Sequence, residues 1–152
     1  MTFVISPIPP ARLSAMRTSG ADDAGAPLAP FTTDEDGAPL RCCLRNARAG
    51  ERVALVAYRP GGTAGAYREV GPVFVHADAC AGYAEPGVYP EAFRPRRQVF
   101  RAYDADGRIT GGVLIEGADA EPAIEELFAD PAVATVHSRN VIHGCYMFTI
   151  TR

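Results

Sequence analysis

The sequence contains no lysine, and all 15 of its basic residues are arginine. A lysine Schiff base, pyridoxal phosphate anchored on lysine, and the lysine of a phosphate-binding P-loop are therefore excluded. Alanine, glycine, proline and arginine are abundant, which indicates a GC-rich bacterial genome. The formal net charge of −3 gives the molecule no general attraction for nucleic acid, so no nucleic-acid partner is expected.

Long apolar runs are also missing. No stretch reaches the ~18 apolar residues that a membrane span requires, and the chain does not start with the basic and then apolar pattern of a signal peptide. We therefore expect a cytoplasmic protein without a membrane partner, in which the cysteines are reduced. There is no CxxC pair, so neither a zinc ribbon nor a thioredoxin-like motif is indicated.

The 152 residues, 47% hydrophobic and 22% charged, fit a single folded domain spanning residues 1–152. Strand-like segments separated by turns predict an α+β fold, mainly antiparallel β-sheet with one or two packed helices. Residues 18–39 are rich in Gly, Ala, Asp and Pro, and they predict a flexible acidic loop within that domain. A lid over a site is the alternative interpretation of this loop.

Two segments have the pattern of helices, and eight have the pattern of strands. One helix is expected to contain Leu13 and Met16, and a second to run from a capping Asp119 to Asp130. Residues 104–107 (DADG) predict a hairpin turn. The strands are expected at residues 2–6, 40–45, 52–58, 73–77, 98–103, 108–115, 133–139 and 145–151. In the last of them, one face is expected to carry Tyr146, Phe148 and Ile150.

Two adjacent cysteines lie in the segment at residues 40–45, and a strand would place them on opposite faces. Cys42 is then most simply a small buried hydrophobe. Cys43 would share its face with Arg41 and Arg45, two guanidinium groups that favour a thiolate and so predict a nucleophile. The alternative is a passive cysteine on a solvated, arginine-bearing face.

A second thiol follows the strand at residues 73–77. His76 ends this strand, and Cys80 lies four residues further along the chain. A thiol and an imidazole can act as a nucleophile and its base, or as two ligands of a metal ion. The alternative is that both are hydrogen-bonded structural residues.

The densest group of chemically active residues lies between residues 136 and 148. His137 and Arg139 share one face of the expected strand, and Asn140 lies on the other face. Arg139 is suited to binding a carboxylate or phosphate at two points, although a bridge to an acidic residue is equally consistent. Cys145 begins the final strand.

A zinc site would require three separate segments to converge in space. The residues of such a site are His76, Cys80, His137 and Cys145. Nothing in the sequence enforces this convergence, so the metal content of the protein stays open at this point.

One basic cluster is interleaved with aromatic residues. Its members are Arg94, Arg96, Arg97 and Arg101, with Phe93, Phe100 and Tyr103 between or beside them. A stacking surface for nucleic acid has weak support in a net-acidic chain. A pocket for a small anion fits better, and a solvated face paired with acidic neighbours fits best.

Several segments together resemble a known bacterial family, the domain of unknown function numbered 1203. They are residues 41–44 (RCCL), 71–77 (GPVFVHA) with Cys80, 101–104 (RAYD), 127–131 (LFADP), 136–140 (VHSRN) and 144–148 (GCYMF). The likeness extends from about Leu40 onward and implies a small stand-alone bacterial protein. It implies no activity, cofactor or site residue, because the family has no established function.

The sequence supports two hypotheses. In the first, the protein is a small enzyme that acts on an anionic metabolite, and in the second it is a non-catalytic ligand-binding or interaction module. The catalytic candidates are His76 and His137 as general base or acid, and Cys43, Cys80 and Cys145 as thiols. The candidates for binding the anion are Arg97, Arg101, Arg139 and Asn140.

Overall fold

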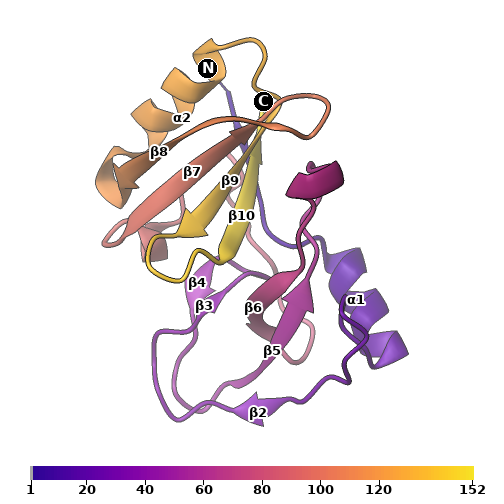
Figure 1. Cartoon of the computed structure of the whole chain (residues 1–152). Coiled ribbons are helices and arrows are strands. Elements are labelled where there is room, and N and C mark those ends of the chain that lie inside the picture. The colour runs from indigo at the N-terminus through magenta and orange to yellow at the C-terminus, as the bar shows by residue number, and fades with distance from the viewer. Residues whose placement is uncertain (1) are drawn as a thin grey trace.

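The computed structural model describes residues 2–152 and contains two five-stranded sheets and two α-helices in this part of the chain (Figure 1). Hydrogen-bonded strand pairs are antiparallel with one exception. The α+β, mainly antiparallel fold expected from the sequence is therefore confirmed.

The first sheet has the strand order β1-β10-β9-β7-β8, and every neighbouring pair is antiparallel. Its strands are β1 (Val4–Ser6), β7 (Arg97–Tyr103), β8 (Ile109–Glu116), β9 (Thr135–Asn140) and β10 (Tyr146–Thr151). Helix α2 (Ala120–Ala129) contributes Ile124 and Phe128 to the hydrophobic cluster that this sheet buries, which we call the first cluster. Two short 3-10 helices, η2 (Glu91–Phe93) and η3 (Gly117–Asp119), lie in the same half of the chain.

The second sheet has the order β2-β5-β6-β3-β4. Its strands are β2 (Phe31–Thr32), β3 (Pro39–Leu40), β4 (Arg45–Asn46), β5 (Arg52–Tyr58) and β6 (Gly71–His76), and the 3-10 helix η1 (Gly65–Tyr67) follows β5. β3 and β6 are parallel, with Leu40 opposite Phe74. Helix α1 (Pro10–Ser19) lies on this half of the molecule (Figure 1), and its Leu13 and Met16 belong to a second hydrophobic cluster.

The two clusters meet at β10. This strand contains a bulge between Tyr146 and Phe148. Phe148 belongs to the first cluster, whereas Tyr146 belongs to the second. The expectation that these two side chains share one face is therefore wrong, because a bulge inserts one residue and reverses the alternation of side chains.

Asp119 occupies the N-cap position of α2, but its side chain makes no capping hydrogen bond. The helix continues directly from η3, and this turn takes the place of the expected cap. In residues 18–39, Asp22 Oδ1 accepts the N–H groups of Ala24 and Ala26. The mobility expected for this segment stays a prediction, as does a single domain over residues 1–152.

Neither of the two α-helices found in residues 2–152 can cross a membrane, because each has only 10 residues.

Gly117 marks the closest approach of η3 to the segment after η2. A Cβ atom added at this position would lie 2.5 Å from the backbone oxygen of Arg94, which cannot move without shifting the chain. We expect Gly117→Ala to lower the free energy of unfolding by about 1–3 kcal/mol, the usual cost of overpacking. Gly111→Ala is the matched control, because nothing lies within 4 Å of its added Cβ. Urea unfolding of both variants checks this, and equal stabilities would contradict it.

Candidate metal centre

The strand predicted over residues 40–45 is wrong. The chain instead turns at residues 41–44, and Leu44 adopts the left-handed conformation with φ +56°. The side chain of Leu44 is buried in the first cluster, whereas Cys42 is buried in the second, and an extended strand cannot reach both. The turn brings the Sγ atoms of Cys42 and Cys43 to 3.8 Å of each other, instead of placing them on opposite faces.

Strand β6 brings a histidine to this turn. β3 lies parallel to β6, so the turn that follows β3 reaches the end of β6, where His76 is the last residue. The Nδ1 atom of His76 is 3.5 Å from the Sγ of Cys42 and 3.7 Å from that of Cys43. Cys80 completes the group, and all four ligand atoms lie within 4.8 Å of one another. We call these four residues the Cys3His cluster.

Three of the six distances within the Cys3His cluster, those that do not involve Cys80, match the edges of a zinc tetrahedron. Zn–S bonds of about 2.3 Å and Zn–N bonds of about 2.05 Å give edges of about 3.8 Å between two sulfurs and about 3.6 Å between sulfur and nitrogen. The three distances among Cys42, Cys43 and His76 are 3.8, 3.5 and 3.7 Å. These residues therefore fit a tetrahedral metal ion with little rearrangement.

Backbone amides point at all three sulfurs. The N–H of His76 donates to the Sγ of Cys42 at 3.2 Å. In the other two cases the donor lies two residues after the cysteine: Arg45 for Cys43, and Gly82 for Cys80. Such hydrogen bonds favour the charged form of the acceptor, but the hydrogen bond with Cys43 raises the pKa of Cys42, burial raises the pKa of Cys80, and only the pKa of Cys43 is lowered overall.

A charged pair lies behind the imidazole. Arg45 donates from Nη2 to Glu51 Oε1 at 2.6 Å, and this arginine lowers the pKa of Glu51 to about 2. The Nε2 atom of His76 is 3.6 Å from Glu51 Oε2 and 3.3 Å from Arg45 Nη2. A metal on Nδ1 would place the proton on Nε2, which now accepts from the Arg45 donor and lies beyond hydrogen-bond distance of Glu51, so the ring or the carboxylate must shift for Glu51 to accept this proton. Glu51 is the candidate acceptor for the Nε2 proton when a metal occupies Nδ1.

The two adjacent thiols differ in acidity. Cys42 donates to Cys43, and this hydrogen bond is the main cause that lowers the pKa of Cys43 and raises the pKa of Cys42. The nearby Arg45 also favours the Cys43 thiolate. Arg41, expected from the sequence beside Cys43, instead donates from Nε to Tyr146 O at 2.8 Å. One of the two predicted arginine neighbours is therefore present.

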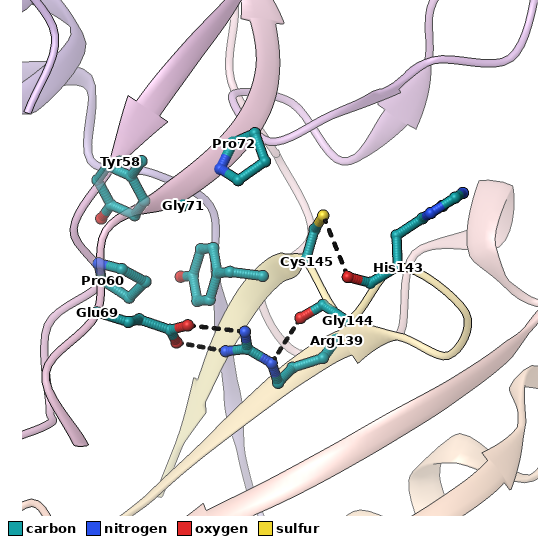
Figure 2. Close-up of a pocket in the computed structure, with 10 residues that line it drawn as sticks. Tyr58, Pro60, Glu69, Gly71, Pro72, Arg139, His143, Gly144 and Cys145 are labelled. Carbon is teal, nitrogen blue, oxygen red and sulfur yellow. Dashed lines mark hydrogen bonds and ion pairs between the residues drawn. The ribbon is translucent and has the colours of Figure 1, made fainter. Parts of the chain in front are cut away.

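Arg139 lies in a separate cavity of about 160 Å³ (Figure 2). Its Nη1 and Nη2 bind both carboxylate oxygens of Glu69, the latter at 2.8 Å, and its Nε donates to Gly144 O at 2.9 Å. Figure 2 shows Cys145 in the same cavity, with its Sγ 3.8 Å from the backbone oxygen of His143. The carboxylate of Glu69 already forms a two-point ion pair with the guanidinium of Arg139. An anionic ligand would have to displace Glu69 to bind Arg139 in the same way.

His137 and Cys145 do not join His76 and Cys80, which answers the question of convergence that the sequence left open. His137 is fully buried, its ring centroid lies 4.7 Å from that of Tyr103 and 5.1 Å from that of Tyr146, and its Nε2 is bonded to Gly61 O. Cys145 lies in the cavity of Arg139. The physical reason is that β9 directs His137 toward aromatic rings of the core, away from the end of β6.

The remaining predicted anion ligands are only partly brought together. Arg97 and Asn140 line one cavity. Arg101 lies opposite His137 in the pairing of β7 with β9, away from that cavity. The catalytic and binding roles of all these residues stay predictions.

Cys42 was not among the site residues expected from the sequence, because the predicted strand made it a small buried hydrophobe. The available signal was the adjacent pair of cysteines, which lacks a CxxC spacing.

Burial lowers the pKa of His137 to about 4. The unfolded chain, with a histidine pKa near 6.5, binds more protons than the folded protein between about pH 6.5 and 4. We therefore expect the free energy of unfolding to fall by about 3 kcal/mol as the pH decreases through this range. The measurement is urea unfolding at a series of pH values. His137→Gln should lose this pH dependence of stability. His143→Gln, a substitution at an exposed histidine, is the control and should retain it. An unchanged pH profile in His137→Gln would contradict the assignment.

Comparison with known proteins agrees with the resemblance seen in the sequence. No curated protein and no solved structure matches the chain. The family described as a protein of unknown function, DUF1203, matches residues 37–152, a range that contains all four residues of the Cys3His cluster. The chain belongs to the DUF1203 family.

Proposed function

We propose that the protein binds one transition-metal ion in the Cys3His cluster, with zinc as the best fit. The observation that carries the proposal is the agreement of three interatomic distances, 3.8, 3.5 and 3.7 Å, with the edges of a zinc tetrahedron. The donor set supports the same choice, because thiolate and imidazole ligands in a tetrahedron favour zinc over the oxygen-binding ions Mg²⁺ and Ca²⁺. Cu(I) and iron are the competing ions.

The metal has a stabilising role in this proposal. Four protein ligands fill a tetrahedron, whereas catalytic zinc sites keep one position for water or substrate. The ion joins three parts of the chain: the turn at residues 41–44, the end of β6, and the segment that contains Cys80. Three thiolates and one Zn²⁺ carry a net charge of −1, and the adjacent Arg45–Glu51 ion pair adds no net charge to it. Metal binding therefore adds to the stability of the second sheet.

The second candidate is one form of the enzyme hypothesis raised by the sequence, acting on a small anionic metabolite; the proximity of the two side chains favours Cys43 as the nucleophile and His76 as its base. A further observation favours it: the hydrogen bond from Cys42 lowers the pKa of the Cys43 thiol. The two candidates differ in how the cysteine reacts. A thiolate bound to metal is protected from iodoacetamide, whereas a metal-free nucleophile is alkylated faster than the other thiols.

The first test is elemental mass spectrometry of untagged protein purified without a chelator. We expect about one zinc per chain. Cobalt substitution should give the visible absorption of a tetrahedral ion together with thiolate-to-cobalt charge transfer. Cys80→Ser and His76→Ala should lower the metal content and remove these bands. Cys80 is exposed, so its substitution leaves the core intact.

Cys145→Ser is the matched control, because this cysteine lies outside the Cys3His cluster. It should keep the metal. A folded, reduced wild-type protein that binds neither zinc nor cobalt would overturn the proposal, and fast alkylation of Cys43 in that protein would support the enzyme instead.

Glu51 should tune the affinity without binding the metal. Glu51→Gln removes the charge that faces Nε2 of His76, and loss of such a second-sphere partner weakens metal binding about 10–100-fold. Competition with a zinc-binding dye measures the change. The exposed Glu35→Gln is the charge-matched control, and equal affinities of the two variants would contradict this role of Glu51.

A further inference from the structure

Several arginines have no carboxylate partner within ion-pair distance among residues 2–152, and two of them, Arg41 and Arg96, lie close to each other. The first is Arg41, whose side chain is buried, with an exposed fraction of only 2%. Its Nε donates to Tyr146 O at 2.8 Å and its Nη1 to Pro39 O, so both acceptors are neutral carbonyls. Burial lowers the pKa of Arg41 to about 10, which leaves it charged at neutral pH. An uncompensated charge of this kind attracts an anion.

The second is Arg96, which is half-buried and close enough to Arg41 for the two charges to repel. Its guanidinium lies over the ring of Phe93, 5.3 Å from the centroid, and this contact fixes its orientation. The acceptors of its Nη atoms are the side-chain oxygens of Asn140 and Asn46, at 3.5 and 3.4 Å. Both distances exceed the usual ~3.2 Å limit for a strong N–H···O bond. The guanidinium of Arg96 is therefore held in one orientation, but its Nη atoms make only weak hydrogen bonds.

Arg96 lines an open cavity of about 460 Å³, which we call the Arg96 cleft. The other residues that line it are Pro39, Arg97, Asn140, Val141, Ile142 and His143. None of these is acidic. The partner of Arg97 is Glu116 at 3.0 Å, and both side chains are more than half exposed, so solvent screens this pair and it restrains Arg97 weakly.

The rim of the Arg96 cleft is apolar. Ile142 is 91% exposed and Val141 is 39% exposed, at the tip of the turn between β9 and β10. The exposed isoleucine can contact a hydrocarbon chain, and the guanidinium beside it can bind a pair of carboxylate oxygens.

We propose that the Arg96 cleft binds a small organic carboxylate that carries an apolar chain, with the carboxylate on Arg96 and the chain against Val141 and Ile142. Arg41 donates to the backbone oxygen of Pro39, which lines the Arg96 cleft, and its charge adds positive potential there. The planar carboxylate matches the planar fork of the guanidinium at two points. The apolar rim distinguishes such a ligand from inorganic phosphate. This site is independent of the metal proposed above.

The experiment is a titration of ¹⁵N-labelled protein with hexanoate at constant ionic strength, followed by amide chemical shifts. We expect saturable shifts at residues 139–143, and an affinity that Arg96→Gln weakens at least about tenfold, because a charged hydrogen-bonded contact is lost. Ile142→Ser should weaken hexanoate binding but leave acetate binding unchanged. Because Ile142 is almost fully exposed, this variant reports on the site even if Arg96→Gln fails to fold.

Two controls separate the site from other causes. Arg108→Gln removes the same charge at an exposed arginine in the turn after β7, and it should bind hexanoate normally. Cys80→Ser should also bind hexanoate, which separates this proposal from the metal centre. The proposal is overturned by an absence of saturable shifts, by equal weakening in Arg108→Gln, or by phosphate binding as tightly as hexanoate.

Discussion

The packing of the molecule depends on the bulge in β10. Each of the two sheets has one apolar face to bury, and the bulge allows neighbouring residues of a single strand to serve both hydrophobic clusters. Tyr146 enters the second cluster, where its ring lies 5.6 Å from that of Tyr58, and its hydroxyl shares a hydrogen bond with Thr149. The guanidinium of Arg41 then binds the backbone of Tyr146 and connects the turn after β3 to the first sheet. The cysteines that follow Arg41 are positioned by this connection.

Much of the fold could be predicted from local patterns. The hairpin of β7 and β8 follows from the DADG turn between two strand-like segments, and Gly107 does adopt a positive φ of 78° there. The bulge in β10 could not be predicted, because alternation in residues 146–150 looks regular until the partner strand is known. The turn at residues 41–44 was hidden for a related reason: Leu44, an unusual residue for a left-handed conformation, completes an apparent strand pattern.

The candidate site was partly visible in the sequence. The pairing of His76 with Cys80 and the effect of Arg45 on Cys43 were both expected, because they depend on short spacings. The addition of Cys42 depends on the parallel contact between β3 and β6, which no local pattern reveals. Likewise, the neutralisation of Arg139 by Glu69 joins residues that are 70 positions apart in the chain.

The left-handed conformation of Leu44 links the turn at residues 41–44 to both hydrophobic clusters. Glycine would adopt this conformation more easily, but the leucine side chain is packed in the first cluster with only 2% of its surface exposed. The turn that brings the sulfurs of Cys42 and Cys43 together is thus anchored in the first cluster, whereas His76 belongs to the second sheet. Grafting the loop alone onto another scaffold would therefore not reproduce the arrangement of the sulfurs. A design would also have to include the two hydrophobic clusters that hold the turn.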